Sequence, residues 1–171
     1  MHIQLPIPST WRSQELGGRR ILFPHDSDGL CLVLDPLVAL PPLYDAAWLT
    51  ALVHRDVPPG TRLAVRRSKP VSTRLGWPST VLDVQLVAPD TDASPPAALG
   101  SPVEGGLRLV EQRITTFYRF LEYGALAEIR ARDMGLLMRL RDPLRALLAE
   151  ARPGWDGSDT SLARLLAGVT R

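Results

Sequence analysis

The residues best placed to bind a metal are His25, Asp26 and Asp28, which lie together in the segment HDSDG. Imidazole and carboxylate groups are ordinary zinc ligands, but a structural zinc site needs a full tetrahedral set of ligands. No second cluster of His, Cys or Asp completes such a set. The same short polar segment, ending in glycine, is typical of the turn in a β-hairpin. The sequence therefore predicts a hairpin turn here, and neither a metal nor a cofactor.

Nucleophilic and acid–base chemistry have equally little support. Cys31 lies inside the apolar run LCLVL, which favours a core position for a small thiol side chain. His54 ends a predicted helix, where a cation interacts favourably with the helix dipole. The chain has no G-x-S-x-G, P-loop or G-x-G-x-x-G motif, and its carboxylates are scattered. We therefore predict that the protein is not an enzyme, with a catalytic site assembled from distant residues as the weaker alternative.

Composition indicates one folded domain with an ordinary core. The 171 residues are 45% hydrophobic and carry a net charge of only +2, and 16 prolines argue against a helical bundle. The densest basic run, Arg62 to Arg74, contains no acidic residue. Nucleic-acid sites usually interleave aromatic and basic residues, and here only Trp77 is near. The solvated face of a strand is the favoured interpretation, so nucleic acid is not an expected partner.

The same reading of the chain predicts a cytoplasmic location. No apolar run approaches the roughly 20 residues that cross a bilayer, so membrane insertion is not expected. The opening MHIQLPIPSTW has neither the basic start nor the apolar segment of a signal peptide. The single cysteine, Cys31, has no partner for an internal disulfide.

The segment from Leu107 to Arg132 organises the predicted fold. Apolar residues alternate along two runs within it: Val110, Ile114, Tyr118 and Phe120, then Ala125, Ala127, Ile129 and Ala131. A period of two residues predicts two half-buried strands. The runs meet near Glu122, Tyr123 and Gly124, where the glycine can adopt a positive φ. A helix from Ala125 onward is the alternative, because Leu, Glu and Arg are good helix formers.

Further elements complete the prediction. Apolar runs predict strands near residues 3–7, 20–24, 30–34, 62–73 and 80–87, and helical spacing predicts helices near 42–54 and 133–151. Pro143 either kinks the second helix or begins it, with Asp142 as its N-cap. We predict an α+β fold, an antiparallel sheet of about six to seven strands flanked by helices. We expect residues 1–155 to form one domain with a flexible, Pro- and Ala-rich loop at 88–106, and residues 156–171 to form a tail in which a short helix can form.

In order and detail these elements resemble the PsbP-like α/β/α sandwich, in particular the bacterial DcrB-related domains. The resemblance covers roughly Met1 to Trp155. It is carried by the opening Leu5-Pro6 through Pro8-Ser9-Thr10-Trp11, the strand LCLVLDPL with its exit at Asp35, the helix Tyr44 to His54 followed by Pro59-Gly60, the turn Gly76-Trp77-Pro78, and the strand pair ending YGALAEI.

This resemblance implies a non-enzymatic adaptor or chaperone. Bacterial proteins of this group accompany type VI secretion effectors and shield the apolar N-terminal helices of those clients, often as homodimers. Such a role requires an exposed apolar face of the sheet. By alternation, the candidate partner-binding residues are Leu63, Val65, Val81, Val84, Phe117 and Leu121. The alternative function is a structural or assembly subunit of a bacterial complex, using an edge strand and the tail.

Overall fold

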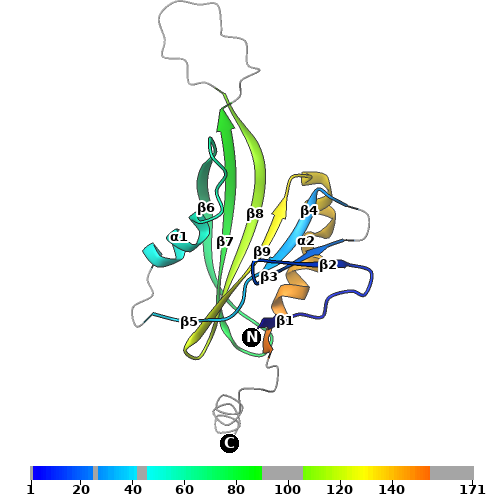
Figure 1. Cartoon of the computed structure of the whole chain (residues 1–171), viewed down its shortest axis with the longest axis vertical. Helices are drawn as coiled ribbons and strands as arrows, with labels where there is room; N and C mark the ends of the chain where they lie inside the picture. Colours follow the sequence, from blue (N-terminus) through cyan, green and yellow to red (C-terminus); the bar gives the residue numbers. More distant parts are fainter. Residues whose placement is uncertain (1, 25–26, 42–45, 90–105, 155–171) are drawn as a thin grey trace, which may run out of the picture.

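The computed structural model describes residues 2–24, 27–41, 46–89 and 106–154. Three predicted features lie wholly or mostly outside this range: the polar turn at His25 and Asp26, the loop at 88–106, and the tail at 156–171. Within the described part of the chain, two helices and two β-sheets form the fold (Figure 1). Neither helix combines the length and the apolar character that crossing a bilayer requires.

The main sheet is antiparallel and has eight strands. Seven of them follow the order β2 (Arg12–Leu16), β3 (Arg19–Phe23), β4 (Leu30–Leu34), β9 (Tyr123–Ala131), β8 (Leu107–Phe120), β7 (Pro78–Pro89) and β6 (Arg62–Ser72), and the short β5 (Val38–Ala39) pairs with β9. A second, two-stranded sheet joins β1 (His2–Gln4) to β10 (Arg152–Gly154). The helices are α1 (Ala46–His54) and α2 (Met134–Ala149). The predicted α+β class with an antiparallel sheet is confirmed.

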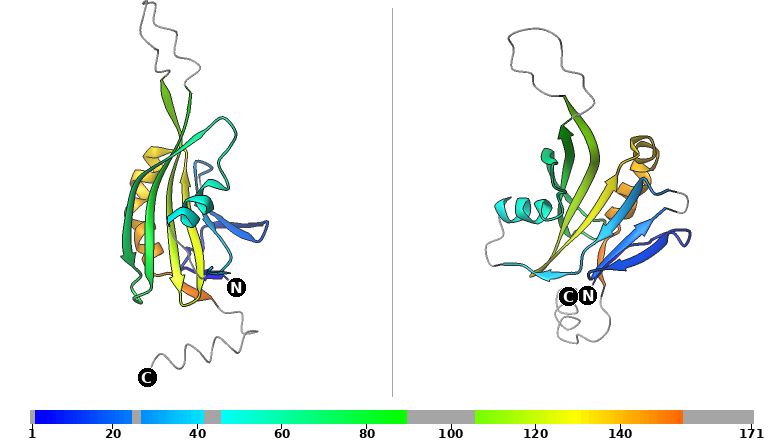
Figure 2. Two further views of the ribbon diagram at one scale, coloured as in Figure 1. Left: turned by 90° about the vertical axis from the view of Figure 1, so that its left-hand side faces the viewer. Right: turned by 45° about the horizontal axis from the view of Figure 1, so that its top comes forward.

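The two helices lie on opposite faces of the main sheet (Figure 2). On the α2 face, the alternating residues of the predicted hairpin pack with β3, β4 and α2. The buried members of this cluster include Leu22, Leu32, Tyr118, Phe120, Ala127, Ile129, Leu137 and Leu144. Burial of a large apolar side chain stabilises a fold by about 1.5–3 kcal/mol, so this cluster is the main core.

The α1 face has a smaller apolar core. Val53 from α1 packs with Leu82, Val84 and Leu86 of β7. Trp48, also on α1, meets the ring of Phe117 edge to face, with the ring centroids 5.6 Å apart. A nine-residue helix is marginal in isolation, so these contacts hold α1 against the sheet.

The second helix begins at Met134, nine residues before the start that one of the two predicted arrangements gives it. Asp133 is its N-cap and accepts a hydrogen bond from the backbone N–H of Leu136 at 2.9 Å. Pro143 therefore lies inside the helix, and a start at Pro143 is wrong. The apolar stripe of α2 faces the sheet, and the Tyr118 hydroxyl donates to the carbonyl oxygen of Leu148 at 2.9 Å.

The turn between β8 and β9 differs from the prediction. Phe120 pairs with Tyr123, so Leu121 and Glu122 form the turn, and the positive φ of 57° belongs to Leu121. Gly124 is instead a strand residue paired with Arg119. Position 124 has no room for a side chain, because a Cβ there would lie 2.6 Å from Leu40 Cδ2 and 2.8 Å from the ring of Phe117.

Gly124→Ala is therefore expected to lower the free energy of unfolding by about 1–3 kcal/mol, the usual cost of overpacking. The matched change Leu121→Asn is expected to leave stability unchanged or slightly higher, because asparagine adopts a positive φ more readily than leucine. Urea unfolding of both variants measures the two effects. An alanine at position 124 that is as stable as glycine would contradict this account of the hairpin.

Candidate functional site

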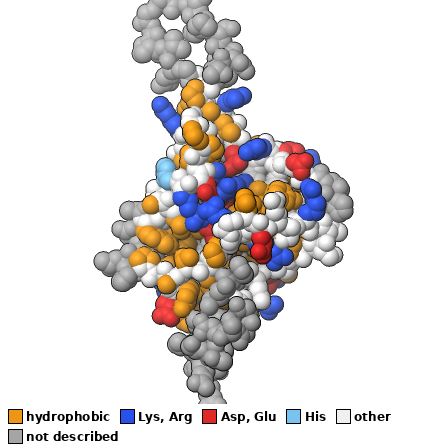
Figure 3. Space-filling model, viewed as in Figure 1, with side chains coloured by type: hydrophobic (Ala, Val, Ile, Leu, Met, Phe, Trp, Pro, Cys, Tyr) orange, Lys and Arg blue, Asp and Glu red, His pale blue; other side chains and the backbone are white. Residues whose placement is uncertain are grey.

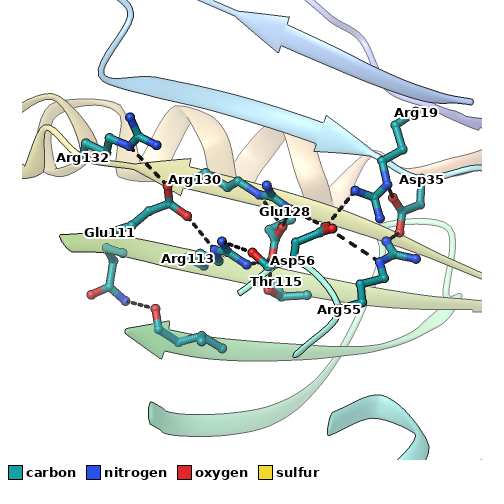
Figure 4. Close-up of polar contacts among 12 residues, drawn as sticks. Arg19, Asp35, Arg55, Asp56, Glu111, Arg113, Thr115, Glu128, Arg130 and Arg132 are labelled. Atoms are coloured by element: carbon teal, nitrogen blue, oxygen red, sulfur yellow. Dashed lines mark hydrogen bonds and ion pairs between the residues drawn. The ribbon is translucent and has the colours of Figure 1, made fainter. Parts of the chain in front are cut away.

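Charged side chains gather at the centre of the α1 face, with hydrophobic side chains around them (Figure 3). The ion pairs join five arginines to four carboxylates (Figure 4). We call this set the Asp56 network: Arg19, Asp35, Arg55, Asp56, Glu111, Arg113, Glu128, Arg130 and Arg132. Five positive and four negative charges nearly balance, so most charges of the network are neutralised by other members of it.

The alternation that sends apolar residues of β8 and β9 toward α2 sends charged residues to the opposite face. Register places Arg113 of β8 directly opposite Arg130 of β9. Like charges at facing positions of neighbouring strands repel each other. The pair therefore requires carboxylates nearby, and Glu111 and Glu128 are supplied two residues away on the same strands.

Asp56 follows the end of α1 and joins three parts of the fold. Its Oδ2 atom lies 2.7 Å from Nη1 of Arg19 and 2.8 Å from Nη2 of Arg130. Arg55 pairs with Asp35, which follows β4, and Asp35 also lies 3.0 Å from Nε of Arg19. These contacts fix the end of α1 to the strands beneath it.

Arg113 is the most deeply buried cation of the network, with 2% of its side chain exposed. Its Nε atom donates to Glu111 at 2.6 Å, and Nη2 donates to the backbone carbonyl of Asp56 at 3.0 Å. Among the described residues Nη1 has no hydrogen-bond partner, and Oε1 of Glu128 lies 3.8 Å from it. A buried charge without partners is very costly, so Glu111 and the end of α1 are needed to keep Arg113 in place.

The electrostatics of the network favour structure over proton transfer. Burial alone would raise the pKa of Asp56, but the hydrogen bond from Arg130 and the charge of Arg19 hold that pKa below its usual value. A carboxylate held ionised in this way is a poor general acid or base near neutral pH. Burial also raises the pKa of the nearby Cys31 thiol, which disfavours the reactive thiolate.

The space around the network is too small for a substrate. Two crevices open between α1 and the sheet, with volumes of about 10 and 70 Å³. Small-molecule sites usually occupy about 300–1,000 Å³. Among the residues that the structure describes, no group of three His, Cys, Asp or Glu side chains could hold a metal ion.

The six residues predicted to bind a partner do not form one exposed face. Val84 and Phe117 are buried beneath α1, and Leu63 packs against the same cluster. Val81 lies three residues before Val84 on β7 and therefore points to the opposite face, where it lines a cavity beside α2. Val65 on β6 and Leu121 in the turn are exposed. Partner binding by these six residues stays a prediction.

The sequence interpretation did not identify the Asp56 network. A local signal was present, because Glu111 and Arg113, and then Glu128 and Arg130, alternate with uncharged residues on two predicted strands. Strands with alternating charges usually turn that side to water, so burial of these residues was not expected. Asp35 and Asp56 are distant in sequence and join the network only through the tertiary fold.

Comparison with solved structures finds the same fold in proteins of very different sequence. The solution structure of cyanobacterial PsbP (CyanoP) from Synechocystis sp. PCC 6803 is similar at 7% identity with a TM-score of 0.58, covering 90% of this chain and 93% of that chain. The Saccharomyces cerevisiae Ran-binding protein Mog1p is similar at 10% identity with a TM-score of 0.54, covering 88% and 89%. A mutant of Mog1 gives 11% identity and the same TM-score, covering 94% and 93%.

No protein-family model and no curated protein matches the sequence. At identities this low, structural similarity establishes the fold alone. The chain therefore has a PsbP-like fold, as the sequence resemblance implied.

The Asp56 network predicts a specific dependence of stability on pH. Because the pKa of Asp56 is lowered from its ordinary value of 3.8, the stabilisation that this carboxylate provides is complete above that value. It is lost as the pH falls through the lower pKa of the folded state. We expect Asp56→Asn to unfold more easily at pH 7, by about 1–3 kcal/mol. Between pH 4 and the acid limit of folding, its stability should also fall less steeply than that of the wild type.

Urea unfolding at a series of pH values measures both effects. Asp28→Asn is the matched control, because the Asp28 side chain is 96% exposed and makes one surface ion pair, with Arg12. A control variant that changed the pH profile as much as Asp56→Asn would contradict the assignment.

Proposed function

We propose that this protein is a non-enzymatic protein-binding domain, an adaptor or chaperone, and that its docking surface is the α1 face. The observation that carries the proposal is the combination found there. A largely buried ionic network with partly exposed arginines lies among exposed apolar side chains, on a surface whose described crevices are small.

Exposed apolar residues lie on three strands of this face. Leu16 of β2 is 62% exposed and pairs with Arg19, so it shares the face of the Asp56 network. Val38 of β5 is 44% exposed and borders the crevice beside α1. Val65 of β6 is 46% exposed and pairs with Val84, which lies beneath α1. Together they surround the network with apolar surface.

This composition suits a protein partner. Protein interfaces combine apolar contact with arginine, and arginines are frequent among the residues that dominate binding energy. Arg55 is 36% exposed and Arg130 is 22% exposed, so part of each guanidinium edge is available to a partner. A Ran-binding protein with a similar fold supports a protein partner for this chain as well.

The specific client that we propose is an apolar helical segment of a secreted bacterial effector of the type VI system. The resemblance to DcrB-related domains supports this choice, and so does the exposed apolar surface of the α1 face, which recognition of an amphipathic helix requires. The protein would act in the cytoplasm before export, and a homodimer could present two such faces to one client.

An assembly role through an exposed strand edge has less support. β6 ends the main sheet and presents a long free edge, the arrangement that permits strand addition. The strand carries Arg62, Arg66, Arg67 and Lys69 together with Pro70. Charges and proline on an edge strand oppose pairing with another strand.

The test is co-purification with the tagged full-length protein from its host, followed by mass spectrometry. We expect one partner with an apolar N-terminal segment to be recovered by the wild type. The double variant Val38→Asp, Val65→Asp should reduce its recovery about tenfold or more, because a charge on the docking surface must lose its hydration.

Met138→Asp is the matched control, because Met138 is 60% exposed on α2, outside the proposed docking face. It should recover the partner as the wild type does, and circular dichroism should show all variants folded. Equal recovery by the double variant would contradict docking on the α1 face. Recovery of several structural subunits, with no partner of the expected kind, would favour the assembly role.

A further inference from the structure

A separate cavity of about 430 Å³ lies on the opposite side of the main sheet, between α2 and strands β6, β7 and β8. This volume is several times that of the crevices on the α1 face and falls within the usual range for small-molecule sites, about 300–1,000 Å³. None of its lining residues belongs to the Asp56 network.

The sides of the cavity carry four cations from two elements. Arg67 and Lys69 alternate along β6, and Arg141 and Arg145 lie one turn apart on α2. Among the described residues, none of these four side chains has an ion-pair partner. The one lining carboxylate, Asp83, accepts a hydrogen bond from Gln112. The cavity therefore has a clear excess of positive charge.

The remaining walls combine apolar side chains with hydroxyl groups, which belong to Ser72, Thr73, Ser79, Thr116 and Tyr118. Val81, Ile114 and Leu148 line the cavity with Tyr118. Thr116, which is 3% exposed, also lines it. Its Oγ1 atom has no hydrogen bond of good geometry among the described residues, although it lies close enough to the Tyr118 hydroxyl to oppose the rise of the Tyr118 pKa. Native proteins pair nearly all buried hydroxyls, so an unpaired one at the wall of a cavity points to a ligand group that completes it.

The lining favours binding over catalysis. The Tyr118 hydroxyl is already committed to the Leu148 carbonyl, and burial raises the pKa of Tyr118 well above its usual value. It is therefore a poor proton donor. The cavity lining includes no cysteine or histidine.

We propose that this cavity binds a small amphipathic anion, whose apolar chain or ring lies against Val81, Ile114 and Leu148 and whose acidic head group pairs with the cations of β6 and α2. A simple anion would leave the apolar walls without a partner, and a neutral apolar molecule would leave the four cations without one. An amphipathic anion satisfies both.

Calorimetric titration of the full-length protein with four probes tests the proposal: decanoate, decanol, decylammonium and inorganic phosphate, all below micelle-forming concentrations. Decanoate should bind about tenfold or more tightly than each of the others, the contribution expected of charge-assisted contacts combined with apolar burial. Added salt should weaken decanoate binding, because the cations are exposed to solvent. Equal binding of decanol, equal binding of phosphate alone, or no binding of decanoate would each overturn the proposal.

Variants of residues that line the cavity test whether decanoate binds there. The double change Arg141→Gln, Arg145→Gln should weaken decanoate binding about tenfold, the effect expected for two charge-assisted contacts. Arg139→Gln is the matched control, because Arg139 is an exposed arginine of the same helix outside the cavity. Thr116→Val removes the unpaired hydroxyl with little change of shape, so it should weaken decanoate binding without lowering the melting temperature. Decanoate affinity that none of these changes alters would overturn the assignment.

Discussion

Two arginines that face each other across neighbouring strands set the main constraint on this structure. Arg113 and Arg130 lie at paired positions near the middle of the sheet, where their like charges repel. Glu111 and Glu128 offset part of this repulsion from the same two strands. Asp56 supplies the other compensating contacts: its carboxylate pairs with Arg130, and its backbone carbonyl accepts a hydrogen bond from Arg113. The two arginines at the centre of the sheet therefore have their full set of partners only when the end of α1 is docked.

The same hairpin gives the molecule two unlike faces. On one face the alternating apolar residues of β8 and β9 form the main core with α2, and a basic cavity remains between α2 and strands β6, β7 and β8. On the other face, the arginines of the ionic network are partly exposed and apolar side chains remain exposed around it. The ligand that we propose binds the first face, and the protein partner that we propose docks on the second. A PsbP-like sheet thus has room for two independent recognition surfaces.

Sequence reasoning succeeded where burial follows local spacing. The runs around Tyr118 and Ile129 predicted β8 and β9, and LCLVL predicted β4 to the residue. It missed β2, whose sequence RSQEL is exposed along its whole length and lacks an apolar period. The partner-binding prediction placed Val84 and Phe117 on an exposed face, because nothing in the spacing of the strand residues shows that α1 will cover them. The Asp56 network was not predicted for the same reason, because Asp56 lies far from β8 and β9 in sequence and meets them only in the folded structure.

A double-mutant cycle between Asp56→Asn and Arg130→Gln tests most directly whether this network holds α1 to the sheet. Unfolding free energies of the wild type, the two single variants and the double variant give the coupling between the two side chains. The account predicts a coupling of about 1–3 kcal/mol, the range found for contacting residues of one network. Effects that simply add, within about 0.3 kcal/mol, would show that Asp56 and Arg130 act independently and would contradict the central role given to their contact.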